Sequence, residues 1–64
     1  MPHKFILGQA VEYRPPGRHY APHGIYVVTA LLPEREGEFE YHIKHTKELH
    51  ERIARESELH GVSR

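Results

Sequence analysis

The strongest constraint on the fold is an alternation of apolar and polar residues over positions 38–45. The stretch reads E-F-E-Y-H-I-K-H, so Phe39, Tyr41 and Ile43 alternate with polar residues. This period of two is typical of a strand with one buried face. Positions 25–32 read I-Y-V-V-T-A-L-L, an almost continuous apolar run that favours a central strand. The polar segment 33–37 between the two runs predicts a hairpin with a five-residue turn.

Proline and glycine delimit the segment that precedes this hairpin. Positions 9–14 read Q-A-V-E-Y-R, in which Val11 and Tyr13 share one face and Glu12 lies on the other. We therefore predict a half-buried strand there. The stretch 15–24 holds three prolines and two glycines, which favour turns and interrupt strand pairing. It is predicted to be an exposed loop of about ten residues.

The last third of the chain supports two interpretations. Local propensity favours a helix over 46–59, with Glu–Arg pairs four residues apart such as Glu48 and Arg52. The apolar face of this helix ends at positions 56–57, where the sequence reads Glu-Ser. The alternative is a short strand over 51–55 followed by a single helical turn. Periodicity alone leaves both open.

Three groups of residues carry a family resemblance and span positions 5–59. They are Phe5, Gly8, Gln9, Val11 and Tyr13; Gly24, Tyr26, Val28, Leu31, Leu32, Pro33 and Glu34; and Tyr41, Ile43, Lys44 and the run Glu51–Leu59. The pattern resembles a group of short, uncharacterised bacterial proteins with the look of an SH3-like small barrel. The resemblance implies a mainly β fold, a five-stranded barrel with a strand at 52–55, a helical turn near 55–59 and a last strand near 59–62. The alternative is an α+β fold with three strands and a C-terminal helix over 46–59.

Length and composition predict one small domain with a thin core. The chain has 64 residues, 38% of them hydrophobic, and no cysteine, so no disulfide can stabilise it. We expect a single domain over 1–64, with residues 1–4 and 61–64 frayed. The residues predicted to be buried are Val11, Val28, Phe39, Ile43 and Ile53. Tyr13, Tyr26 and Tyr41 are predicted to be core residues, with a role in docking as the alternative.

Charge and hydropathy exclude several classes of protein. The formal net charge is zero, which gives no general reason to bind nucleic acid or anionic lipid. The chain has no apolar run of about 18 residues and no apolar stretch long enough for a secretory signal near its start. With the lack of cysteine, these features predict a cytoplasmic protein without a membrane span.

The residue types needed for catalysis or metal binding do not form a motif. There are two serines, no aspartate and no cysteine, and neither serine lies in a nucleophile motif. Seven histidines are present, but His19 and His23 lie among prolines, and a strand would point His42 and His45 to opposite faces. We expect no enzyme, no metal site, no cofactor and no small-molecule substrate. A metal-binding or pH-responsive role for the histidines is the least favoured class.

The loop after the first predicted strand carries the best functional signal. It concentrates arginine, tyrosine and proline without an acid, and arginine and tyrosine are enriched at binding hot spots. The candidate binding residues are Arg14, Arg18, His19, Tyr20 and His23. Residues 1–23 hold three basic side chains and one glutamate, whereas residues 24–64 hold six basic and eight acidic ones. We therefore predict a non-enzymatic module that binds a protein through loop 14–23, with weak RNA or DNA binding within a larger assembly as the alternative.

Overall fold

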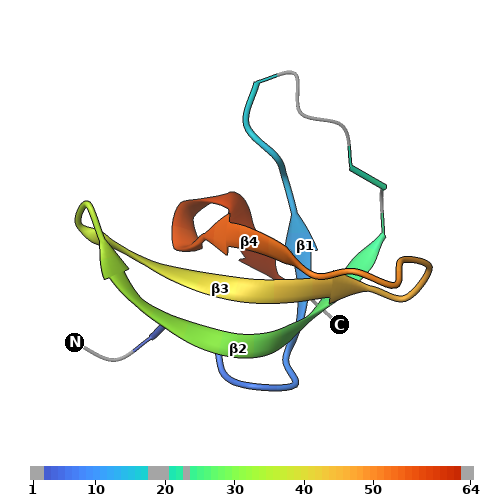
Figure 1. The fold of residues 1–64 in the computed structure, drawn as a ribbon, viewed down its shortest axis with the longest axis horizontal. Helices are drawn as coiled ribbons and strands as arrows, with labels where there is room; N and C mark the ends of the chain where they lie inside the picture. Colours follow the sequence, from blue (N-terminus) through green and yellow to red (C-terminus); the bar gives the residue numbers. More distant parts are fainter. Residues whose placement is uncertain (1–2, 18–20, 23, 63–64) are drawn as a thin grey trace.

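The computed structural model describes residues 3–17, 21–22 and 24–62, which form one antiparallel five-stranded sheet. Along the chain the elements are β1 (Ala10–Tyr13), β2 (Ile25–Arg35), β3 (Glu38–His45), β4 (Arg52–Arg55), the 3₁₀ turn η1 (Glu56–Glu58) and β5 (Leu59–Gly61). The strand order is β4-β3-β2-β1-β5. Figure 1 shows β2 and β3 as two long curved strands that run side by side, while β1 crosses behind them. The prediction of a mainly β fold is confirmed.

The sheet is open rather than closed. β4 and β5 form its two edges, and no strand pairing joins them in the part of the chain that the structure describes. The predicted barrel is therefore not confirmed by the strand pairing.

The alternative helix over 46–59 is wrong. Ala54 pairs with Tyr41 of β3, and the strand ends in the turn η1 before β5 begins. The strand and helical turn predicted for this region are confirmed, with the strand beginning at Arg52. Sheet pairing outweighs helix propensity here because the segment has too few apolar residues to bury a helical face.

The turn of the central hairpin is shorter than predicted. Strand β2 continues through Pro33 to Arg35, and only Glu36 and Gly37 connect it to β3. Both connecting residues have positive φ angles, 54° and 85°, as a two-residue hairpin turn with the favoured twist requires. Pro33 lies at a shift in register between Leu32 and Glu34, where a missing N–H does not break the ladder.

The core lies on one face of the curved sheet and is built around two fully buried tyrosines. Its buried apolar members are Phe5, Val11, Tyr26, Val28, Tyr41, Ile43, Ala54 and Leu59. The burial predicted for Val11, Val28 and Ile43 is confirmed, and Phe39 packs against the core while partly exposed.

Ile53 was predicted to be buried, and this is wrong, because 59% of the residue is exposed. Its partner across the ladder is His42 on the outer face, whereas Ala54 lies opposite the buried Tyr41. Side chains alternate strictly between the faces of a strand, so the register places the small Ala54 inside and Ile53 outside.

The described N-terminal residues are bound to the end of the sheet near the hairpin turn. The Tyr41 hydroxyl accepts hydrogen bonds from the backbone N–H groups of Lys4, at 3.1 Å, and Phe5, at 3.3 Å, and donates one to Glu56 Oε2. The same carboxylate oxygen accepts a bond from Lys4 N at 2.9 Å. His3 Nε2 donates to the Leu32 carbonyl oxygen at 2.6 Å. These contacts join the start of the described chain to β2, β3 and η1.

Candidate interaction site

Of the five predicted binding residues, the structure describes Arg14. It follows β1, its side chain is 72% exposed, and its Nη2 atom lies 3.9 Å from Glu12 Oε1. Its backbone N–H donates to the Glu58 carbonyl oxygen at 2.9 Å. This bond fixes the start of the connection between β1 and β2, residues 14–24, to the turn before β5. The remaining four predicted residues, Arg18, His19, Tyr20 and His23, lie outside the described residues.

An open pocket of about 340 Å³ lies where the connection leaves the sheet. Its lining residues are Glu12, Tyr13, Arg14, Gly24 and Ile25. The last paired residues of β1 and β2 are Glu12 and Ile25, and beyond them the two chains separate. The pocket follows from this separation, because two strands that stop pairing leave a gap at the mouth of their connection. It combines an aromatic and an apolar wall with one carboxylate and one guanidinium group.

The wall of the pocket is supported from the core by a second tyrosine. The Tyr13 ring meets the buried Tyr26 ring edge to face, with 5.4 Å between ring centroids. The Tyr26 hydroxyl donates to the Pro22 carbonyl oxygen at 2.8 Å, which attaches the far side of the connection to the core. Burial raises the pKa values of both tyrosines above their ordinary range, so both hydroxyl groups are neutral at neutral pH.

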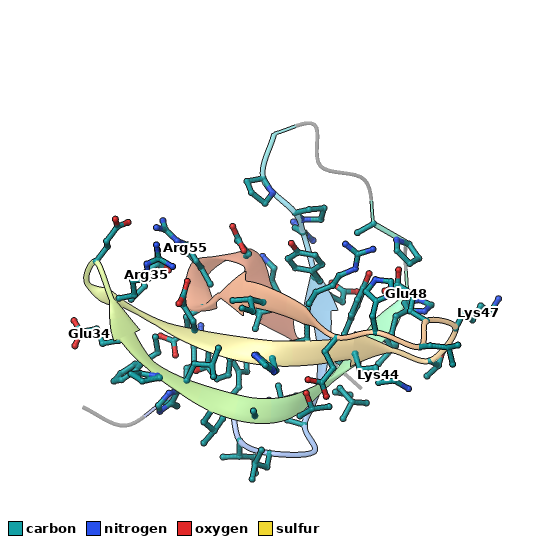
Figure 2. All side chains as sticks on the ribbon, viewed as in Figure 1. Glu34, Arg35, Lys44, Lys47, Glu48 and Arg55 are labelled. Carbon is teal, nitrogen blue, oxygen red and sulfur yellow. The ribbon has the colours of Figure 1, made fainter. Side chains whose placement is uncertain are left out.

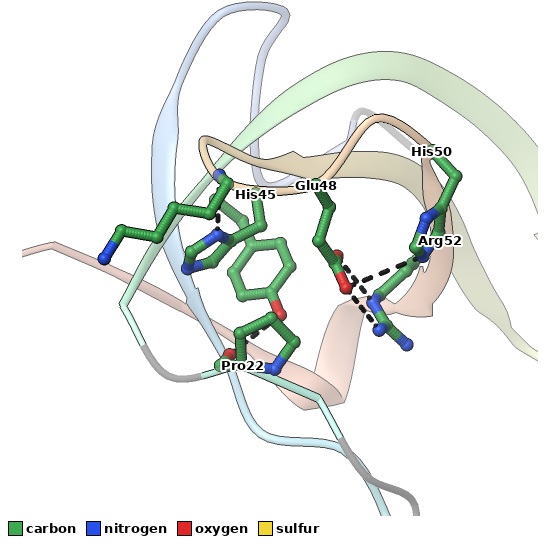
Figure 3. A network of polar contacts seen from close by, with 7 residues as sticks. Pro22, His45, Glu48, His50 and Arg52 are labelled. Atoms are coloured by element: carbon green, nitrogen blue, oxygen red, sulfur yellow. Dashed lines mark hydrogen bonds and ion pairs between the residues drawn. The ribbon is translucent and has the colours of Figure 1, made fainter.

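A polar network behind Tyr26 holds the loop between β3 and β4, residues 46–51. Arg52 donates two hydrogen bonds to the Glu48 carboxylate, from Nε at 3.0 Å and from Nη2 at 2.7 Å (Figure 3). The hydrogen bonds from Arg52 hold the pKa of Glu48 below its usual range. His50 Nε2 lies 3.6 Å from Glu48 Oε2, and the charge of this histidine acts in the same direction. The Glu48 side chain is only 14% exposed, so the pair is a structural clasp rather than a solvated ion pair.

His45 is the buried polar residue at the base of this loop. Its ring meets the Tyr26 ring edge to face at 4.9 Å, and its Nδ1 atom accepts a hydrogen bond from the Lys47 N–H at 3.0 Å. The Glu48 N–H donates to the His45 carbonyl oxygen at 3.1 Å. The base of loop 46–51 is therefore fixed by backbone bonds to a residue that packs in the core.

The sequence predicted the pairing of Glu48 with Arg52, but on a helix rather than across a loop. Glu48 and Arg52 were interpreted as a pair four residues apart on a helix, and the two do form an ion pair. The pair closes a loop instead, because a bend over 46–51 also brings residues four apart together.

The described histidines are spread over the molecule. His42 Nδ1 lies 2.8 Å from Glu51 Oε1 on the outer face of the sheet, whereas His45 lies inside and His60 is exposed on β5. Within residues 3–17, 21–22 and 24–62, no three histidine or acidic side chains come together in a way that could hold a metal ion. His19 and His23 fall outside these ranges.

Two glutamates of the central hairpin form ion pairs with Arg55. Arg55 Nη2 donates to Glu36 Oε1 at 2.7 Å, and Arg55 Nη1 lies 3.6 Å from Glu38 Oε2. Glu38 also accepts a bond from the Ser57 N–H at 2.9 Å. Hydrogen bonds from Ser57, and more weakly the charge of Arg55, lower the pKa of Glu38. These glutamates join the hairpin tip to β4 and η1.

Comparison with known proteins does not assign a family. A scan with protein-family models found no match, and searches of the curated proteins and of the solved structures found none either. Among the described residues, no helix is long and apolar enough to cross a membrane.

Proposed function

We propose that this protein is a non-enzymatic binding module that captures a protein partner at the mouth of the 14–24 connection. The observation that carries the proposal is the open pocket of about 340 Å³, with Tyr13 and Ile25 beside the exposed charges of Glu12 and Arg14. Recognition sites commonly combine aromatic and apolar side chains with a few charged or polar groups, as this lining does.

The support beneath the pocket favours binding over an inert loop. Tyr26 holds Pro22 on one side of the connection, and the Glu58 carbonyl oxygen holds the Arg14 N–H on the other. Groups that are already ordered lose less conformational entropy when they bind, so more of the contact energy remains as affinity.

An SH3-like fold is part of the same proposal. The strand order β4-β3-β2-β1-β5 supports it, and so does the 3₁₀ turn that connects β4 to β5 along the chain. In this interpretation, the 14–24 connection is the long loop after the first strand, which small barrels of this kind commonly use for docking.

The test is capture from a lysate of the source cells with the immobilised protein, with and without nuclease. Arg14→Ala combined with Arg18→Ala is expected to abolish or strongly weaken capture while the fold stays intact. The matched control removes two exposed cations elsewhere, with Lys4→Ala and Arg35→Ala, and is expected to keep the partner. If the Arg14/Arg18 double variant still captures the partner and the control variant does not, the binding site lies on another face than the one proposed.

The nuclease arm separates the protein partner from the alternative. Binding to RNA or DNA predicts capture that disappears with nuclease and falls steeply with salt, because neutralised phosphates release counterions. That result would overturn the proposal of a protein partner.

A further inference from the structure

His45, the last residue of β3, packs in the core with only 4% of the residue exposed. Its ring meets the Tyr26 ring edge to face, with 4.9 Å between the ring centroids. Gly24 also lies against the ring, since a Cβ atom on Gly24 would come within 3.0 Å of His45 Nε2. This packing holds the imidazole in one orientation.

The hydrogen bond at Nδ1 of His45 determines where the ring carries its proton. Nδ1 accepts a bond from the Lys47 N–H at 3.0 Å (Figure 3). A ring nitrogen that accepts a hydrogen bond carries no proton, so the neutral ring holds its single proton on Nε2. A second proton can bind only at Nδ1, where it faces the N–H group of Lys47. Protonation therefore sets two donors against each other, and the bond between them is lost.

The Lys47 bond lies at the base of loop 46–51, directly after β3. The Glu48 N–H follows it with a bond to the His45 carbonyl oxygen at 3.1 Å, and the Glu48 carboxylate then binds Arg52 at the start of β4. Figure 2 shows Lys47 and Glu48 at the end of the sheet where β3 leads into this loop. Because these contacts follow one another along the chain, loss of the Lys47 bond loosens the loop from its base.

The charged groups around His45 favour a charged ring once the loop has moved. The charge of His45 contributes to the lowered pKa of the Glu48 carboxylate, so the carboxylate attracts a charged imidazole in return. A proton on Nδ1 can meet that carboxylate only after the Lys47 N–H has left its position. The Tyr26 hydroxyl stays neutral at neutral pH because burial raises its pKa. The titratable groups on the elements packed around His45 are Tyr13 and Tyr26 on β1 and β2, Lys47, Glu48 and His50 in the loop, and Arg52 on β4.

We propose that His45 is a proton-operated latch for loop 46–51: a proton taken up at Nδ1 breaks the bond to Lys47 and opens the loop. The closed loop requires a neutral ring, whereas the open loop admits a charged one, so acid favours the open loop. Imidazole side chains take up their second proton between about pH 8 and pH 5, which places the change in that range. Gly24 both touches His45 and lines the pocket, so the latch also regulates binding there, a consequence that rests on the proposed function.

The first experiment follows the wild-type chain by nuclear magnetic resonance from about pH 7.5 to pH 5, where imidazole titrates. The nitrogen shifts of the His45 ring are expected to show a proton on Nε2 at the upper end of this range and on both nitrogens at the lower end. The protection of the Lys47 N–H from hydrogen exchange, corrected for the intrinsic rate, is expected to fall with the same midpoint. The fall should be about tenfold, which corresponds to the loss of one ordinary hydrogen bond. The Gly8 N–H, which bonds to the Val28 carbonyl oxygen at 2.8 Å, is the internal control and should keep its protection.

Two variants assign the effect to one histidine. His45→Gln has no titrating ring and is expected to remove the pH dependence of Lys47 protection. The matched control is His50→Gln, in the same loop and with 65% of its side chain exposed, and it is expected to keep that dependence.

A neutral His45 ring with its proton on Nδ1 would overturn the inference, and so would a ring that stays neutral to the end of the titration. Lys47 protection that stays constant while His45 titrates, or a pH dependence that is lost in His50→Gln and kept in His45→Gln, would do the same. The wild-type measurements decide the outcome even where His45→Gln fails to fold. They use the chain alone, so a failure of partner capture leaves the latch standing, and a failure of the latch leaves the proposed function standing.

Discussion

The two fully buried tyrosines, Tyr41 and Tyr26, use their hydroxyl groups differently at the two ends of the sheet. The Tyr41 hydroxyl accepts from two backbone N–H groups and donates to Glu56, and so joins three segments of the chain. The Tyr26 hydroxyl makes one bond, to Pro22 in the long connection. These contacts hold the N-terminal segment against the first end, whereas the second end keeps an open pocket between the Tyr26–Pro22 bond and the bond from the Arg14 N–H to the Glu58 carbonyl oxygen. The difference indicates that the first end contributes more to the stability of the fold, and the second end is the one at which we propose binding.

The largest expected effect comes from the residue that packs between the two ends. Ile43 on β3 is fully buried, and Ile43→Ala should lower the free energy of unfolding by about 2–5 kcal/mol. In a domain of this size that loss can unfold the protein. Urea unfolding followed by circular dichroism measures it. Ile53→Ala is the matched control, because Ile53 is exposed, and its cost should stay below about 1 kcal/mol. Equal losses for the two variants would contradict the assigned register.

Removing each hydroxyl group in turn measures how much Tyr41 and Tyr26 each contribute to stability. Tyr41→Phe leaves the Lys4 and Phe5 N–H groups without this acceptor and Glu56 without its donor, so it should cost about 1–3 kcal/mol. Tyr26→Phe removes one bond and should cost about 0.5–1.5 kcal/mol. Thermal melts of both variants check the order. A larger loss of stability for Tyr26→Phe would show that the end with Tyr26 contributes more to the stability of the fold than the end with Tyr41.

Acid should destabilise both ends through carboxylates with lowered pKa values. The Tyr41 hydroxyl, with the Lys4 N–H, lowers the pKa of Glu56, and hydrogen bonds from Arg52 lower that of Glu48. A carboxylate with a lowered folded-state pKa contributes stability above its unfolded value, about 4.3, and this contribution is lost as the pH falls through the folded value.

We therefore expect unfolding free energies to fall below about pH 5, and Glu56→Gln and Glu48→Gln each to flatten that fall. The measurement is urea unfolding at a series of pH values between 7 and 3. A wild-type stability that rises on acidification would show that these hydrogen bonds are not formed in solution.

The smallest effect on stability is expected at the end that carries the pocket. Arg14→Ala with Arg18→Ala should change the unfolding free energy by no more than about 0.5 kcal/mol, because the Arg14 side chain is exposed and its only described ion pair, with Glu12, is long. Differential scanning calorimetry of this double variant beside wild type measures the change. A large drop in melting temperature would show that the start of the connection is structural, and would remove the reason for a binding role.

Local patterns in the sequence were enough to predict most strands and part of the core. The alternation over 38–45 and the apolar run over 25–32 predicted the central hairpin, because a strand places every second side chain on one face. The same rule identified Val11 and Ile43 as buried. The strand at Arg52–Arg55 needed the family resemblance as well, since local propensity alone favoured a helix.

The tertiary structure decided everything that depends on which segments meet. Register against β3 placed Ala54 inside and Ile53 outside, although isoleucine is the more hydrophobic of the two. The clasp of Glu48 by Arg52 and the bonds between Tyr41 and the N-terminal segment also required the folded chain. The pocket arises where two strands stop pairing. A sequence determines local preference residue by residue, whereas the pocket and the hydrogen bonds of the Tyr41 hydroxyl group depend on contacts between residues far apart in the chain, and only the packed sheet supplies those contacts.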